Sequence, residues 1–172
     1  MPGKTRLMRA SGARQALRAA AFAGLAALAL AIAGCASRQN EGALAGANNA
    51  PPGSQQDFVV NVGDRVFFES DSSELSAQSV ATLEKQAQWL NSYYQYTFTI
   101  EGHADERGTR EYNIALGARR AQTVHDYLVS RGVQAHRMRT ISYGKERPVA
   151  VCDDISCWSQ NRRAVTNLNA GS

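Results

Sequence analysis

Acidic residues are absent from the start of this sequence. Before Cys35 the chain carries five basic residues and neither Asp nor Glu, and residues 19–34 form an unbroken run of 16 small or apolar residues. A membrane-spanning helix needs about 20 strongly apolar residues, so this Ala-rich run is too short for that alternative. A basic start, a short apolar stretch and small residues before a cleavage point are typical of a secretory signal. We therefore predict that residues 1–34 are a cleaved signal peptide.

An excess of positive charge is also absent once this segment is set aside. The whole chain has a net charge of +4 and an isoelectric point of about 9.2. Without the five basic residues of the signal, 14 basic and 15 acidic residues remain. The basic character belongs to the signal and does not indicate nucleic-acid binding, so we expect no nucleic-acid partner.

Cysteine is scarce as well, because only Cys152 and Cys157 follow Cys35. An even pair in an exported domain favours a disulfide, and the alternatives are two free thiols or part of a metal site. No suitably spaced His or Cys accompanies the pair, which argues against zinc. We predict a disulfide between these two residues, no metal and no other cofactor.

The apolar run ends in the stretch Ile32-Ala33-Gly34-Cys35. This stretch resembles the lipobox of bacterial lipoproteins, in which the cysteine is lipidated and becomes the first residue of the mature chain. The resemblance implies lipidation at Cys35, and Ala36 after it implies sorting to the outer membrane. Acyl chains contribute about 0.8 kcal/mol per buried CH₂, so a multiply acylated cysteine holds a chain firmly on a membrane.

Large apolar residues are rare in residues 36–56, which are rich in Asn, Gly, Ala, Ser, Gln and Pro. Such a segment cannot bury enough surface to order itself. We predict that residues 35–56 comprise the lipidated cysteine and a flexible tether. Residues 57–172 then form one compact domain, since no internal repeat or second linker interrupts them.

Apolar periodicity in this domain predicts strands that alternate with helices. The predicted strands are residues 59–68 in one or two pieces, 96–101, 138–143 and 164–168, the last expected at a sheet edge because it is polar. The predicted helices are residues 75–91 and 109–131, and residues 145–158 are predicted to be a loop. The order β-α-β-α-β-β predicts an α/β sandwich of the α+β class, with two helices on one face of a mixed sheet.

An apolar stripe supports each predicted helix, and cap residues support the second. Thr109 is a good N-cap of the second helix and Gly132 a good C-cap. In the first helix Leu83 and Leu90 fall on the apolar face, and Gln86 falls on the polar face that we expect to meet solvent.

Ionisable groups are concentrated in residues 100–120, between the strand 96–101 and the helix 109–131. A charged loop at a strand-to-helix junction is a common place for a binding site. The spacing of His103, Asp105 and Glu106 matches no metal motif, and no obvious nucleophile lies beside them for acid–base hydrolysis. A solvated turn that ends in a helix cap remains an alternative.

Recognition of a small charged ligand by Asp105 and Arg120 is the interpretation that we favour. Arg120 lies at the border of the apolar stripe, so it either snorkels to solvent or reaches a carboxylate or a pocket. An aspartate accepts hydrogen bonds from an ammonium, and an arginine forks onto a carboxylate. A zwitterion such as the free end of diaminopimelate in peptidoglycan stems would suit both side chains.

Several motifs occur in one order along residues 60–165. They are Gly102-His103-Ala104-Asp105-Glu106-Arg107-Gly108-Thr109, Tyr112-Asn113, Leu116-Gly117, Arg120-Ala121, Ser142-Tyr143-Gly144 and Asn161-Arg162-Arg163-Ala164. Together they resemble the OmpA-like peptidoglycan-binding domain family, and their closer form is similar to the peptidoglycan-associated lipoproteins within it. The resemblance implies a βαβαββ domain that binds peptidoglycan non-covalently through diaminopimelate and is not an enzyme.

The resemblance also implies roles for single residues. It places ligand contacts at Asp71, Asp105 and Arg120, and it places Asn113 and Leu116 at positions that shape or flank the pocket. The motif Asn161-Arg162-Arg163 is implied at the same rim. Ser70 and Gly117 depart from residues that are usual in the family.

A cellular role is implied as well. Relatives of this kind work with TolB and the other Tol proteins, which link the envelope layers and support outer-membrane constriction during cell division. The expected location is the outer membrane, with a lipid anchor at Cys35 and the domain facing the periplasm. The alternatives are an OmpA-like lipoprotein outside the Tol system and an enzyme that acts on peptidoglycan.

Overall fold

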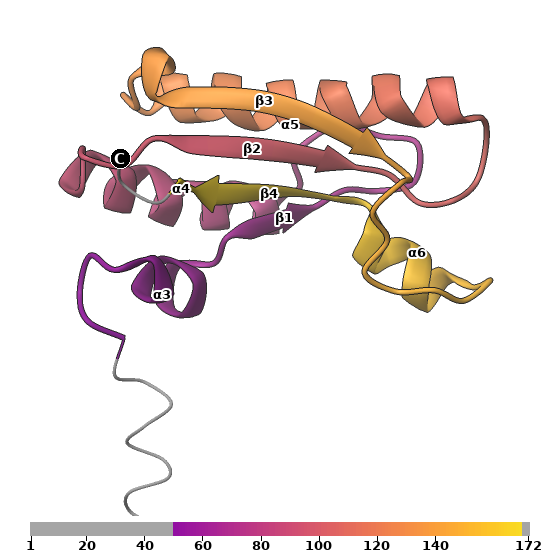
Figure 1. Cartoon of the computed structure of the whole chain (residues 1–172), viewed down its shortest axis with the longest axis horizontal. Coiled ribbons are helices and arrows are strands. Elements are labelled where there is room, and N and C mark those ends of the chain that lie inside the picture. Colours follow the sequence, from indigo (N-terminus) through magenta and orange to yellow (C-terminus); the bar gives the residue numbers. More distant parts are fainter. Residues whose placement is uncertain (1–49, 170–172) are drawn as a thin grey trace, which may run out of the picture. The chain divides into compact units, whose positions relative to one another are not determined.

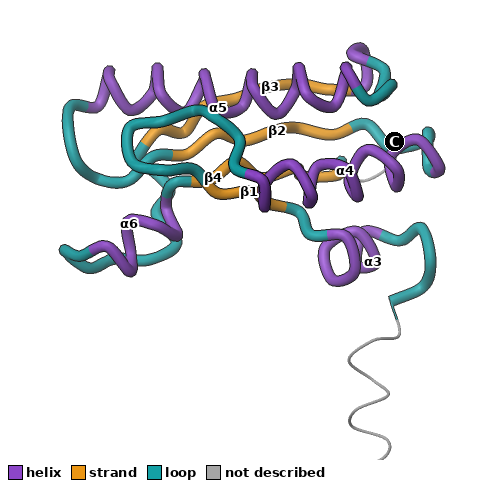
Figure 2. Tube along the Cα trace, turned by 180° about the vertical axis from the view of Figure 1, so that it is seen from behind, coloured by secondary structure: helices purple, strands orange, loops and turns teal. Residues whose placement is uncertain are grey.

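A single mixed sheet organises the domain in the computed structural model, which describes residues 50–169. Its strands are β1 (Arg65–Phe67), β2 (Phe98–His103), β3 (Met138–Gly144) and β4 (Arg163–Leu168). The spatial order is β1-β4-β2-β3, and only β2 and β3 run parallel. The helices α4 (Ala77–Ser92) and α5 (Arg110–Ser130) cover one face of this sheet (Figures 1 and 2). The predicted fold class is therefore confirmed.

The two main helices lie within two residues of the ranges predicted for them, 75–91 and 109–131. The Ser76 side chain accepts a hydrogen bond from the Ser79 N–H, and Thr109 caps α5 in the same way. At the end of α5, Gly132 has a φ of +87°, and the Val133 N–H donates to the Leu128 carbonyl at 3.0 Å. This is the pattern of a Schellman cap, in which a glycine takes the left-handed conformation that other residues avoid.

The core lies between the sheet and these helices. It is built from the alternate side chains of the strands that face α4 and α5, together with the apolar stripes of both helices. Its fully buried members include Leu83, Leu90, Phe98, Ile100 and Leu128. The period-two pattern of β2 and the helical stripes thus meet in one layer, as the sequence predicts.

The prediction of a strand at residues 59–62 is wrong. The chain forms a short helix α3 (Gln55–Asp57) and a π-helical turn η1 (Phe58–Val62) before the strand β1. Phe58 is fully buried and packs against Trp89 with ring centroids 5.0 Å apart. Burial of this one aromatic ring fixes the turn, and the valines that suggest a strand remain half exposed.

The described chain contacts the domain before the expected boundary at residue 57. Ala50 is buried, and the Tyr96 hydroxyl donates to the Gly53 carbonyl at 2.8 Å. The Gly53 N–H in turn donates to the Asp57 carboxylate at 2.9 Å. The last part of the expected tether therefore packs on the domain, whereas residues 1–49, with the expected signal peptide, Cys35 and most of the tether, lie outside the described residues.

The expectations for β4 and for Gln86 are both wrong, and one contact explains why. The strand β4 is central, because it pairs with β1 on one side and with β2 on the other. The Thr166 hydroxyl of β4 donates to the Gln86 side chain at 3.0 Å, and Gln86 donates to the Gly63 carbonyl at 2.7 Å. Gln86 is fully buried, so the polar groups of the strand and the helix satisfy each other in the interior.

A short helix α6 (Ile155–Asn161) interrupts the region predicted to be a loop. Asp154 caps it by accepting a hydrogen bond from the Ser156 N–H at 2.7 Å. The structure joins Cys152 and Cys157 by a disulfide at the start of this helix. A second short turn, η2 (Ala135–Arg137), precedes β3.

Candidate ligand-binding site

Two loops and the start of α5 enclose a cavity at one end of the sheet. One loop follows β1, the other follows β2, and both leave the sheet at the same end (Figure 1). The cavity has a volume of about 240 Å³ and is lined by Ser70, Asp71, Asp105, Arg107, Gly108, Tyr112, Asn113 and Leu116. The fold thus brings together four of the five predicted ligand-site residues, which are far apart in the sequence.

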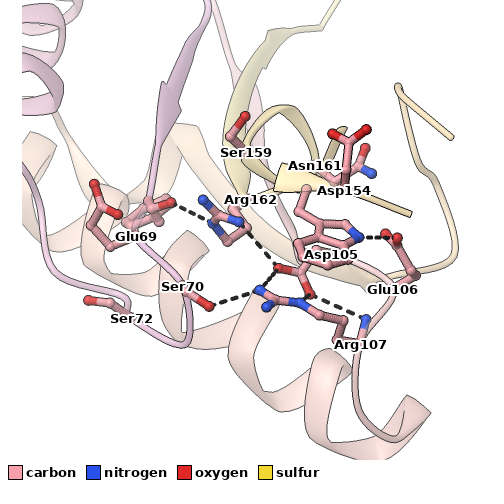
Figure 3. Close-up of polar contacts among 12 residues, drawn as sticks. Glu69, Ser70, Ser72, Asp105, Glu106, Arg107, Asp154, Ser159, Asn161 and Arg162 are labelled. Atoms are coloured by element: carbon pink, nitrogen blue, oxygen red, sulfur yellow. Dashed lines mark hydrogen bonds and ion pairs between the residues drawn. The ribbon is translucent and has the colours of Figure 1, made fainter. Parts of the chain in front are cut away.

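Asp105 is the buried anion of this site. It is only 7% exposed, and Arg107 donates to both of its oxygens, from Nη2 at 2.6 Å and from Nε at 3.2 Å (Figure 3). Arg162 reaches Oδ2 from the other side at 3.5 Å. Burial alone would raise the pKa of this carboxyl, but the bonds and charge of Arg107 outweigh burial and hold the pKa below its usual value. The carboxylate is therefore ionised at neutral pH.

Asp71 presents a second carboxylate to the same cavity. It has a φ of +55°, and it is the only described residue other than glycine in the left-handed region. The Tyr112 hydroxyl, from the first turn of α5, donates to its Oδ1. This strained backbone is characteristic of loops that hold a side chain for function.

Arg120 lies behind the cavity and is not among the residues that line it. Its side chain is fully buried, and it donates to three backbone carbonyls: Ser72 at 2.8 Å, His103 at 2.8 Å and Glu69 at 3.1 Å. Burial, together with the charge of Arg162, lowers its pKa to about 10, so the guanidinium still carries its charge at neutral pH. Arg120 therefore ties the loop after β1 to the end of β2 and does not snorkel to solvent.

Asn113 and Leu116 form the floor contributed by α5. Both are buried, and they lie on the helix face that also carries Arg120. The Asn113 side chain donates to the Arg107 carbonyl at 2.7 Å. The amide therefore fixes the loop after β2 against the helix.

The sequence interpretation missed the part played by Arg107. This side chain is 44% exposed, lines the cavity and also donates to the Ser70 hydroxyl at 2.8 Å. A basic residue two positions after Asp105 was the available signal. Arg162, which the resemblance implies at the pocket rim, is buried and is not among the residues that line the cavity, and it donates to the Phe68 carbonyl at 3.0 Å.

Neither a metal centre nor a membrane-spanning helix is found in residues 50–169. No three His, Cys, Asp or Glu side chains there come close enough to hold a metal ion. No helix of this part of the chain combines the length and hydropathy of a membrane span. The site in this region consists of the carboxylates of Asp71 and Asp105, the partly exposed guanidinium of Arg107 and backbone polar groups, with the buried guanidinium of Arg120 behind them.

Residues 67–162 match the model of the OmpA family. The chain belongs to the OmpA family. Within this family it is 69% identical over 149 residues to a peptidoglycan-associated lipoprotein of Rhizobium meliloti, over 83% of this chain and 85% of that protein. It is 43% identical over 159 residues to a protein of the same name from Pseudomonas aeruginosa, over 83% of this chain and 94% of that protein.

Solved structures place the fold in the OmpA family as well. The crystal structure of the peptidoglycan-associated lipoprotein from Burkholderia pseudomallei has a TM-score of 0.60 and 43% identity, over 62% of this chain and 90% of that one. The C-terminal domain of Helicobacter pylori MotB has a TM-score of 0.58 at 22% identity, over 62% of this chain and 84% of that one. The second likeness shows the shared fold alone.

Proposed function

We propose that this protein is an envelope lipoprotein that binds peptidoglycan non-covalently through the free zwitterionic end of diaminopimelate. The observation that carries the proposal is the cavity in which Asp71, Asp105 and Arg107 meet. The two carboxylates accept hydrogen bonds from the ligand ammonium, and the partly exposed guanidinium receives the ligand carboxylate. The names of the two relatives described above, both peptidoglycan-associated lipoproteins, support this ligand.

Arg120 has a supporting role in this proposal, which changes the expectation from the sequence. Its three bonds to carbonyls hold the loop that carries Asp71 and the strand end that leads to Asp105. Arg107, which lines the cavity, takes the place of the guanidinium that faces the ligand. Three charged side chains thus contact the ligand, and Arg120 holds the backbone segments that carry Asp71 and lead to Asp105.

Co-sedimentation with purified sacculi tests the proposal. The domain should sediment with sacculi, and free diaminopimelate should release it by competition. Asp105→Ala should weaken binding by roughly 1.5–3 kcal/mol, the contribution of a hydrogen bond to a charged group. Asp126→Ala is the matched control, because Asp126 is an exposed carboxylate on α5 outside the cavity. Equal sedimentation of the Asp105 variant and the wild type would reject the site.

We further propose that the chain is anchored in the outer membrane through acylated Cys35 and works with TolB and the other Tol proteins during division. The lipobox-like stretch and the names of the relatives support the anchor, and the family resemblance supports the Tol partners. Cys35→Ser should release the protein to the soluble periplasmic fraction. The mature domain should capture TolB at micromolar concentration, and failure to capture it would favour a lipoprotein outside the Tol system.

We propose binding without catalysis at this site. In the cavity, Arg107 holds the Asp105 carboxylate and Tyr112 holds the Asp71 carboxylate, an arrangement suited to placing fixed charges against a ligand. Incubation of the domain with sacculi should release no soluble muropeptides. Their appearance would instead indicate an enzyme that acts on peptidoglycan.

A further inference from the structure

The helix α6 lies beside the cavity and has no part in the function described so far. The disulfide between Cys152 and Cys157 fixes its first turn. At its end Asn161 is buried, donates to the Ala150 carbonyl at 2.7 Å and accepts from the Val149 N–H at 2.8 Å. The short helix is therefore fastened at both ends to its own loop, which is the arrangement that a precisely placed side chain requires.

Trp158 is the side chain that α6 directs toward the loop after β2. The centre of the Arg107 guanidinium lies 4.3 Å from the centroid of the Trp158 ring, which is a cation–π contact. The indole N–H donates to the Glu106 carboxylate of the same loop. One aromatic ring thus contacts two successive residues of the loop that carries Asp105.

Arg107 needs such support, because it is a long side chain with much of its surface in water. It is 44% exposed, and its bonds to Asp105 and Ser70 both come from the guanidinium end. An exposed ion pair of this kind loses side-chain entropy when it is held in one geometry. A ring stacked on the guanidinium restricts the other conformations of the Arg107 side chain and keeps the guanidinium at the cavity wall.

We propose that Trp158 is a positioning residue that holds Arg107 where it receives the ligand carboxylate. Trp158 thereby sets a preference for peptide stems whose third residue ends in a carboxylate beside the ammonium. This inference rests on the proposed binding of diaminopimelate. Without the ring, Arg107 leaves the cavity wall part of the time, and the ammonium contacts of Asp71 and Asp105 remain. The loss therefore falls on ligands with a carboxylate beside the ammonium and spares ligands with the ammonium alone.

Two synthetic tripeptides separate these contributions. In the first, L-Ala-γ-D-Glu-meso-diaminopimelate, the third residue ends in an ammonium and a carboxylate. In the second, L-lysine replaces diaminopimelate, so that end carries the ammonium alone. Calorimetric titration of the domain with each peptide gives the ratio of the two affinities, which we use as the readout.

Two variants distinguish the aromatic ring from mere bulk. Trp158→Phe keeps a π face for Arg107, and Trp158→Leu keeps an apolar side chain without one. A cation–π contact at a partly exposed site corresponds to an affinity change of about two- to fivefold. We expect Trp158→Leu to bind the diaminopimelate peptide more weakly by this factor and to bind the lysine peptide as the wild type does. The ratio of the two affinities should therefore move toward one in Trp158→Leu, and Trp158→Phe should retain most of the wild-type ratio.

The outcomes separate the two proposals. An unchanged ratio in Trp158→Leu, or equal losses for both peptides in both variants, would overturn the role of Trp158 and leave the ligand site intact. No binding of the diaminopimelate peptide by the wild type would overturn the proposed function as well. Circular dichroism and the thermal midpoint of each variant show whether a loss reflects unfolding, and the Phe variant supplies the comparison if the Leu variant is unstable.

Discussion

At the residue scale, two buried arginines hold the domain together through backbone carbonyls. Arg120 bonds to three carbonyls beneath the cavity, and Arg137 bonds to the carbonyls of Leu90, Tyr93 and Tyr96 at the opposite end of β2. A planar guanidinium can serve several fixed acceptors at once, which a lysine ammonium on a flexible stem does less well. Each arginine therefore acts as a rigid connector between a helix or turn and the start or end of a strand.

Replacement of Arg120 should destabilise the fold more than it alters the surface. Arg120→Met leaves three carbonyls with no guanidinium partner, and we expect a loss of about 2–4 kcal/mol in the free energy of unfolding. Urea unfolding measures this loss directly. The neighbouring Arg119 is exposed, so Arg119→Met is the matched control and should change stability by less than about 0.5 kcal/mol. Equal stability of the two variants would contradict the connector role.

His103 makes the stability of the domain sensitive to acid. It is 2% exposed, and neither ring nitrogen has a hydrogen-bond partner among the described residues. Burial, together with the charges of Arg163 and Arg147, lowers its pKa to about 4, although Glu101 lies 3.6 Å from Nε2. In the unfolded chain this histidine binds a proton near pH 6.5. The contribution of the neutral, buried histidine to the free energy of unfolding is therefore fully present above pH 6.5 and is lost as the pH falls to about 4.

Replacement of His103 should make the free energy of unfolding less dependent on pH below pH 7. Between pH 7 and pH 4.5 we expect the wild type to lose roughly 2 kcal/mol more than His103→Phe, from the 1.36 kcal/mol that corresponds to one pKa unit. Urea unfolding at both pH values measures the difference. The exposed His136 provides a control, since His136→Phe should retain the acid sensitivity of the wild type. Parallel curves for the wild type and His103→Phe would show that the histidine is not the cause.

At the element scale, α5 approaches β2 closely enough to need glycine on both sides. A Cβ added to Gly102 would lie 1.8 Å from the Gly117 carbonyl oxygen. A Cβ added to Gly117 would lie 2.4 Å from the Ser142 hydroxyl and 2.8 Å from the Gly102 oxygen. This contact sets the position of α5 on the sheet and, with it, the distance of Asn113 and Leu116 from Asp105.

The two glycines should tolerate alanine to different extents. Gly102→Ala forces a methyl group into backbone, and we expect it to cost at least about 2 kcal/mol of stability and to weaken sacculus binding. Gly117→Ala first meets the Ser142 hydroxyl, a side-chain atom that can shift more easily than backbone, so its cost should be smaller. Thermal unfolding of both variants tests the ranking, and unchanged stability of both variants would mean that the helix does not rest on this contact.

A helix or strand is predicted well when the residues that determine it are close to it in the sequence. The apolar stripes of α4 and α5 and the cap residues of α5 are local, so the sequence predicts both helices, whereas only the family resemblance implies that the loops after β1 and β2 share one site. The central place of β4 depends on β1, which is far away in the sequence, and its polarity is explained only by the buried partner Gln86. Likewise α6 depends on the disulfide and on Asn161, and η1 on the burial of Phe58, none of which a periodic pattern reveals.

One feature of the candidate site also depends on contacts between residues that are distant in the sequence. The motif identifies Asp105 and Arg120 but cannot tell which guanidinium faces the cavity. That depends on how the loop after β2 folds back, with Arg107 on Asp105 and Arg120 on backbone carbonyls behind it. The exposed arginine lies two residues from its carboxylate, and the buried one lies fifteen residues away on a helix.

At the scale of the whole molecule, the described chain enters the domain at the end away from the site. Gly53 is bonded to Tyr96, which precedes β2, whereas the cavity contains Asp105, which follows β2. Figure 1 shows the same arrangement, with α3 and the loops of the cavity at opposite ends of the sheet. Within residues 50–169, the first described segment and the candidate site therefore lie at opposite ends of the sheet.

A titration of the ¹⁵N-labelled domain with meso-diaminopimelate tests the central claim most directly. We expect saturable shifts of the backbone amide signals of residues that line the cavity, namely Ser70, Asp71, Arg107, Gly108 and Asn113, and we expect these shifts to be lost in Asp105→Asn. Amides at the opposite end of β2 should not move. Absence of shifts at millimolar ligand, or shifts that persist in Asp105→Asn, would contradict the claim that this cavity binds diaminopimelate.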